Sequence, residues 1–141
     1  MNLQAARIAF TKNLGRLILK GDELGFKLLI DEVKRDPRTA KWNATHCRIR
    51  VEDGRRCEMT PEQHASLDHA FKPIGIEKSV HIQALAADIY IMVNGEISND
   101  REGYATLGQF WKSLHYLARW GGDFEGFPDL GHFSFTWDGR A

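Results

Sequence analysis

Apolar side chains recur with a helical period in two parts of the chain. Residues 3–20 carry them at the spacing of an amphipathic helix, and Gly21 is a plausible stop. Residues 104–118 repeat this spacing, and Gly121 and Gly122 break it. The pattern of residues 104–118 is typical of core packing rather than of a cofactor site. We therefore expect one helix at the start of the chain and another late in it.

Other runs are rich in apolar and β-branched residues, which predicts strands. These runs are 26–33, 84–93 and 133–137. Asn94-Gly95 is the strongest two-residue hairpin signal, so residues 96–98 should return beside the second run. The expected fold is α+β, with a small antiparallel sheet flanked by helices.

Between the first two strands, residues 42–60 are predicted to form an inserted hairpin that turns at Asp53-Gly54. With that turn, Arg50 rather than Cys47 faces Cys57. A direct cross-strand disulfide is therefore not implied, and we expect free thiols. A second metal site, built from the two cysteines and His46, is an alternative.

A short helix should follow this hairpin. Thr60 is a good N-cap, Pro61 suits the first helical position, and the helix should end near Phe71.

The composition indicates a folded, single-domain protein. The 141 residues, 43% of them hydrophobic, are enough for one domain spanning 1–141 with a real core. Nineteen basic and nineteen acidic residues cancel, so nothing general favours nucleic acid as a partner. A local basic patch, better explained as a solvated hairpin, is formed by Arg48, Arg50, Arg55 and Arg56.

The sequence predicts neither a membrane span nor a signal peptide. No apolar run approaches the ~18–20 residues of a membrane span. Residues 1–21 lack the apolar block and cleavage site of a signal peptide. We expect a chain that is made in a cytoplasm and is not exported by a leader of its own.

Candidate metal ligands stand out in and just before the second of these runs, residues 84–93. Asp88 lies among apolar residues of the predicted strand 84–93, where a carboxylate is costly to bury unless it is paired or binds a metal. The alternative is a strand-end carboxylate that caps a loop or pairs with an arginine. His81 is seven residues earlier, and an odd spacing in one strand would put the two on opposite faces. They converge only if His81 lies in the loop before the strand.

A second pair of candidates is Asp129 and His132. Their spacing of three brings the side chains to one side of a single turn, which Pro128 favours. A metal ligand and a base need that proximity. Taken alone, His132 is more typical of a structural histidine. No role is assigned to the remaining histidines, His46, His64, His69 and His115.

In order along the chain, these residues resemble the zinc D-Ala-D-Ala carboxypeptidase and dipeptidase family, which includes phage L-alanyl-D-glutamate peptidases and shares its fold with the hedgehog signalling domain. The motifs are Ser79-x-His81 through Asp88, then Trp120-Gly121-Gly122-Asp123-Phe124, then Asp129-x-x-His132-Phe133. Residues 107–114 also resemble the helix of small phage-type members. The resemblance covers 74–137 well and 24–38 loosely.

The resemblance implies a zinc site held by His81, Asp88 and His132, with Asp129 as general base. It also implies an arginine that holds the substrate, for which Arg35 is the best match and Arg38 the fallback. Ser79 could orient His81 or only cap the loop, and Trp120 should pack under the site.

Two departures from the family pattern stand out. Ala84 replaces a usual glycine, and the gap between Arg35 and Ser79 is longer than in compact members, which fits an insertion at 42–60.

The function implied is that of a zinc metallopeptidase that cleaves peptidoglycan stem peptides at the L-Ala-D-Glu bond. It would act as a phage or prophage endolysin, a monomer made in the host cytoplasm and released to the cell wall through a holin. The alternatives are a bacterial D-Ala-D-Ala dipeptidase or carboxypeptidase, a non-catalytic zinc-containing wall-binding module, and a structural phage protein without a metal.

Overall fold

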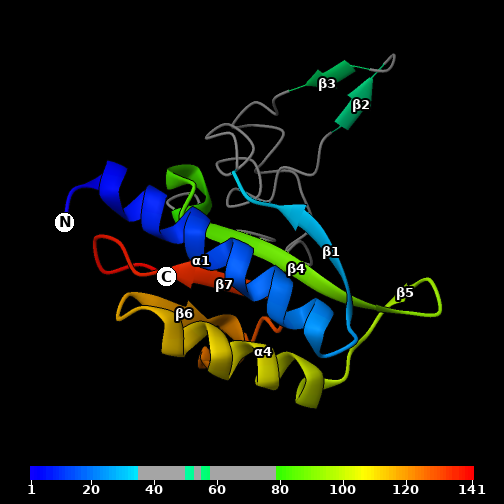
Figure 1. The fold of residues 1–141 in the computed structure, drawn as a ribbon. Coiled ribbons are helices and arrows are strands. Elements are labelled where there is room, and N and C mark those ends of the chain that lie inside the picture. Colours follow the sequence, from blue (N-terminus) through cyan, green and yellow to red (C-terminus); the bar gives the residue numbers. More distant parts are fainter. Residues whose placement is uncertain (35–49, 53–54, 58–78) are drawn as a thin grey trace.

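A computed structural model describes residues 1–34, 50–52, 55–57 and 79–141 (Figure 1). These residues form an α+β fold, as predicted. The main sheet is antiparallel, with the strand order β1-β4-β7-β6, and β5 pairs with β4. Its strands are β1 (Lys27–Glu32), β4 (Ala86–Val93), β5 (Glu96–Ile97), β6 (Ala118–Trp120) and β7 (His132–Phe135).

Two helices, α1 (Leu3–Glu23) and α4 (Arg101–Leu114), pack against each other and against the sheet (Figure 1). The core between them includes a cluster of aromatic rings. The ring of Phe10 in α1 meets the rings of Trp111 in α4 and Phe135 in β7 edge-on, with centroids 5.5 and 5.4 Å apart. These contacts fix one face of the sheet and leave the opposite face of β4 and β7 for polar residues.

The first helix ends later than the sequence predicts. α1 continues through Gly21 to Glu23, so the prediction of a stop at Gly21 was wrong. Gly21 serves packing instead, because a Cβ there would lie 2.4 Å from Cδ1 of Leu28 in β1. The chain turns at Gly25, which has a φ of 81°.

The second helix also differs from its prediction. α4 begins at Arg101, after the side-chain cap Asp100, and ends at Leu114 rather than at residue 118. His115 is already extended, and residues 118–120 form β6, which the sequence did not predict. The helix was predicted too long because Leu117 also fits the helical spacing. The strand was missed because three residues are too few to show the alternation of a strand.

The predicted hairpin at Asn94-Gly95 is confirmed. Val93 pairs with Glu96 across the turn. Asn94 and Gly95 have φ values of 53° and 81°, as this type of tight turn requires.

Part of the predicted insertion is described. β2 (Arg50–Glu52) pairs with β3 (Arg55–Cys57), with Arg50 opposite Cys57, so the predicted register is confirmed. Arg35, Arg38, Cys47 and the predicted helix 60–71 lie outside the described residues. Within the described part of the chain, no helix is both long and apolar enough to cross a membrane.

Candidate metal centre

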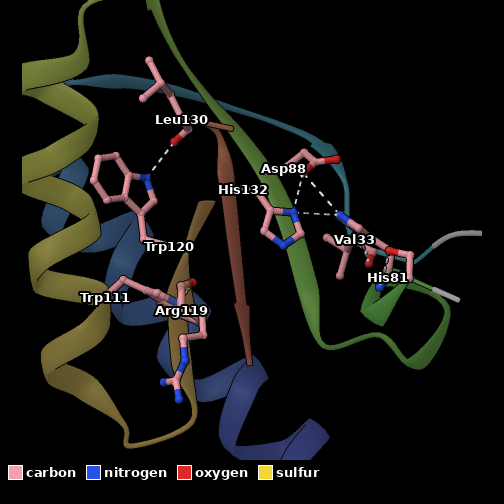
Figure 2. A network of polar contacts seen from close by, with 9 residues as sticks. Val33, His81, Asp88, Trp111, Arg119, Trp120, Leu130 and His132 are labelled. Carbon is pink, nitrogen blue, oxygen red and sulfur yellow. Dashed lines mark hydrogen bonds and ion pairs between the residues drawn. The ribbon is translucent and has the colours of Figure 1, made fainter. Parts of the chain in front are cut away.

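Two neighbouring strands bring together two of the three predicted ligands, Asp88 and His132. Asp88 in β4 is directly opposite His132 in β7, and cross-strand partners share a sheet face. The alternate residue Phe133 points to the helices, where its ring meets that of Trp111. Figure 2 shows Asp88 and His132 on one side of these strands and Trp111 on the other. Both ligand candidates are therefore on the face that the helices leave free.

The third candidate reaches this face from a short 3₁₀ helix, η1 (Val80–Gln83). Its N-cap is Ser79, whose Oγ accepts a hydrogen bond from the backbone N–H of His81 at 3.2 Å. The helix ends at Ala84 in the left-handed conformation (φ 55°, ψ 43°), and the chain then enters β4. His81 thus lies before the strand, as predicted, and Ser79 caps the loop that orients it.

The three side chains converge through one atom each (Figure 2). His81 Nε2 lies 3.3 Å from His132 Nδ1 and 3.3 Å from Asp88 Oδ1. His132 Nδ1 lies 3.4 Å from Asp88 Oδ1. All three residues are buried, with 2%, 7% and 9% of their surface exposed for His81, His132 and Asp88. The arrangement is a nearly equilateral triangle of two nitrogens and one oxygen.

The size of this triangle fits a tetrahedral metal ion. Zinc bonds of ~2.0–2.1 Å at tetrahedral angles place neighbouring ligand atoms about 3.3–3.4 Å apart. The three observed separations match one face of such a tetrahedron, which leaves the fourth corner free. The residues therefore fit a divalent ion, and His and carboxylate donors suit zinc among others.

The other nitrogen of the His81 ring, Nδ1, also has a polar partner. His81 Nδ1 lies 3.2 Å from the carbonyl oxygen of Val33, which can only accept, so Nδ1 carries the proton in the neutral ring. Nε2 then presents a lone pair to the triangle. A backbone carbonyl that fixes a histidine in this way is a common outer partner of a metal ligand. A register shift in β1 between Ile30 and Glu32 precedes this carbonyl.

Among the described residues, two buried polar atoms at this site have no hydrogen-bond partner. One is Asp88 Oδ1, a corner of the triangle, and the other is His132 Nε2, the ring nitrogen that is not part of the triangle. Burial by itself would raise the pKa of Asp88, but its contacts with His132 and His81 lower that pKa well below its usual value. Asp88 is therefore a carboxylate that needs positive charge nearby, which a metal ion would supply.

The predicted base, Asp129, stands at the start of a tight turn that ends at His132. The backbone N–H of His132 donates to the carbonyl of Asp129 at 3.2 Å, and the N–H of Asp129 donates to the carbonyl of Gly121 at 2.8 Å. A Cβ at Gly121 would lie 2.3 Å from the Asp129 oxygen and 2.8 Å from Cβ of His132. Gly121 thus allows the turn to lie directly against the Trp-Gly-Gly segment.

The carboxyl group of Asp129 is shaped by the same surroundings. Asp129 is exposed as a residue, yet the protein around its carboxyl removes enough water to raise its pKa. The charge of His132 opposes this rise, Asp88 adds to it, and a hydrogen bond with the Gly131 backbone opposes it. A carboxyl with a raised pKa beside a candidate metal site is suited to exchange protons.

Trp120 packs beneath the site, as predicted. Its ring lies between two glycines, since a Cβ at Gly108 or Gly122 would come within 2.3 or 2.2 Å of it. Its Nε1 donates to the carbonyl of Leu130 at 2.9 Å, inside the turn between Asp129 and His132 (Figure 2). The indole therefore ties α4 to the turn that carries the candidate base.

Sequence reasoning missed three residues around the triangle. The Val33 carbonyl gave no signal, because a backbone group can come from any residue type. The ring of Phe124 lies 5.5 Å from that of His132. Tyr90, two residues after Asp88, has a pKa raised to about 12 by burial and by carboxylates that include Asp88 and Asp129. The alternation of β4 could have placed Tyr90 on the site face.

Of the histidines without an assigned role, the structure describes His115. His115 stacks on Phe135 with centroids 4.6 Å apart, which agrees with a structural role. His46, His64 and His69 lie outside the described residues, as does Arg35. The structure therefore brings together four of the five predicted site residues, and the fifth stays a prediction.

Two buried histidines and a carboxylate in metal-ligand spacing, with a further acid beside them, form a donor set that occurs in metal-dependent hydrolases. A family model described as D-alanyl-D-alanine carboxypeptidase matches residues 75–135, which contain all four described site residues. The predicted family resemblance is confirmed over these residues, which are similar to that peptidase family.

No curated protein is similar enough to match the chain. Among solved structures, the L-Ala D-Glu endopeptidase ChiX of Serratia marcescens is similar at a TM-score of 0.49 and 16% sequence identity. That similarity covers 79% of this chain and 68% of the other.

Proposed function

We propose that this protein is a zinc-dependent peptidase that cleaves the stem peptides of peptidoglycan. The observation that carries the proposal is the triangle of His81, Asp88 and His132, whose edges of 3.3, 3.3 and 3.4 Å suit a tetrahedral ion. The family match over residues 75–135 supports the substrate class.

The protein groups have distinct tasks in this proposal. His81, Asp88 and His132 would hold the ion, which when bound supplies Lewis acidity and acidifies a water molecule. Asp129 takes a proton from the attacking water and returns one to the leaving amine. The backbone N–H of Gly131 and the nearby histidines keep its carboxylate available for this exchange. Arg35 would hold the carbonyl or carboxylate of the substrate.

We further propose that the scissile bond is L-Ala-D-Glu and that the protein is an endolysin acting in host cell lysis. The support is the resemblance of the motifs to phage-type peptidases. A second candidate is a D-Ala-D-Ala carboxypeptidase or dipeptidase, which the description of the matching family favours. A non-catalytic wall-binding module is less well supported, because such a module has no need of Asp129.

One experiment separates these candidates. Purified protein loaded with zinc is incubated with peptidoglycan and, separately, with free D-Ala-D-Ala, and the products are identified by mass spectrometry. We expect new termini at L-Ala and D-Glu. Release of D-Ala alone would favour the second candidate, and intact substrates in both reactions would contradict a peptidase.

A further inference from the structure

Tyr90 occupies the site face of β4 beside the turn that carries Asp129. Its ring lies directly against Gly131, because a Cβ built on that glycine would lie 2.7 Å from Cε1 and 2.9 Å from Cδ1 of the ring. Distances this short leave no room for a side chain at position 131. The ring and the glycine backbone therefore form one close contact.

Gly131 is fixed from two other directions. Its carbonyl oxygen accepts a hydrogen bond from the backbone N–H of Ile89 at 2.8 Å, which continues the pairing of β4 with β7. A hydrogen-bond interaction with its backbone lowers the pKa of Asp129, and because a carboxylate oxygen can only accept, the donor is the Gly131 N–H. The Gly131 N–H is therefore the backbone group suited to orient the Asp129 carboxylate.

We propose that Tyr90 is a positioning residue for the proposed peptidase reaction: its aromatic ring supports Gly131 and thereby aims the Asp129 carboxylate at the metal site. The kinetic part of this inference rests on the proposed function. The part that concerns the Gly131 backbone does not.

The ring rather than the hydroxyl carries this role. Among the described residues, the Tyr90 hydroxyl has no hydrogen-bond partner. The hydroxyl of Tyr104, by contrast, accepts one from the Ile91 backbone N–H at 3.0 Å. Phenylalanine at position 90 would keep every contact with Gly131, whereas alanine would remove the surface on which the turn lies.

Kinetics on a stem-peptide substrate test the proposal. Tyr90→Ala should lower kcat by about 10- to 100-fold with KM changed less than about 3-fold, because a shift of ~1 Å in a catalytic group costs up to ~100-fold. Tyr90→Phe should stay within about 3-fold of the wild type, and zinc content should be unchanged in both. Gly131→Ala, which meets the ring from the other side, should behave like Tyr90→Ala.

Matched controls come from the same chain. Tyr116 is 72% exposed, and Gly15 in α1 has open space around it. Tyr116→Ala and Gly15→Ala should therefore leave kcat unchanged. If Tyr90→Ala does not fold, Tyr90→Leu replaces it, because leucine also lacks the flat ring that lies against Gly131.

Hydrogen exchange of the Gly131 amide gives a readout that needs no activity. Exchange should become faster in Tyr90→Ala but stay slow in Tyr90→Phe and Tyr116→Ala. If the wild type cleaves no peptide, the proposed function fails. The exchange measurement still shows whether the Tyr90 ring supports the Gly131 backbone. Unchanged exchange and kcat in Tyr90→Ala would overturn the proposal. A loss in Tyr90→Phe equal to that in Tyr90→Ala would assign the role to the hydroxyl instead.

Discussion

Ala84 shows how a single residue departs from the pattern of the family it resembles. It ends η1 in the left-handed conformation, with φ 55° and ψ 43°. A side chain in this conformation costs roughly 1–2 kcal/mol, whereas glycine adopts it freely. The usual glycine at this position is thus explained by backbone geometry, and Ala84 is a strained substitute next to His81.

Replacing this residue is a direct test of strain. Ala84→Gly should increase the free energy of unfolding by about 1 kcal/mol, because the strain is relieved in the folded state. Denaturant unfolding measures the change. The control is Ala5→Gly in the ordinary helical backbone of α1, which should lower stability. A lower stability in Ala84→Gly would contradict the argument.

Catalysis should depend on Asp129, whereas metal binding should not. Asp129→Asn keeps the size of the side chain but removes the base, so kcat should fall by about 10²- to 10⁴-fold while zinc stays bound. Release of soluble peptides from peptidoglycan measures the rate. Asp123→Asn, which removes an exposed carboxylate paired with Lys112, should have little effect. Near wild-type lysis by Asp129→Asn would exclude Asp129 as the base.

At the scale of elements, the site depends on how closely β6, η2 (Gly121–Asp123) and the turn before β7 approach each other. Gly121 lies where a side chain would meet the backbone oxygen of Asp129, which cannot move aside as a flexible side chain could. Gly121→Ala should therefore destabilise the protein by about 1–3 kcal/mol. Thermal unfolding measures the loss. Gly15→Ala, in an open helical position, should instead be neutral or stabilising.

The sequence predicted elements where a periodic pattern was long enough. α1, α4, β4 and the hairpin after it follow directly from spacing and turn chemistry. β6 was missed because three residues do not establish a period. Gly21 was misinterpreted because glycine can end a helix or let a strand pack against it, and only the tertiary contact with Leu28 decides between them.

Across the whole molecule, the two faces of the sheet have different roles, one in stability and the other at the candidate metal site. Its helix-covered face holds the aromatic core, and the opposite face of β4 and β7 carries the ligands. The sequence could predict which residues form the ligand triangle. It could not predict the geometry of the triangle, because Asp88 and His132 meet only through the pairing of β4 with β7. The Val33 carbonyl follows β1 and reaches the site through the pairing of β1 with β4, and Tyr90 lies on β4 two residues after Asp88.

Because the three ligands come from η1, β4 and β7, a bound ion should tie separate parts of the fold together. Zinc at ~100 times its dissociation constant should stabilise the folded protein by about 2.7 kcal/mol. Thermal unfolding with zinc and with a chelator measures this, and the midpoint should be several degrees higher with zinc. Equal midpoints for the wild type would contradict a site that spans these elements.

In the proposed function, His81, Asp88 and His132 bind one zinc ion. The most direct measurement is the metal content of purified protein by elemental mass spectrometry, for the wild type, His81→Ala, His132→Ala and the control His115→Ala. We expect one zinc per chain in the wild type and the control, and none in the other two variants. Zinc retained by His81→Ala and His132→Ala, or absent from the zinc-supplied wild type, would contradict it.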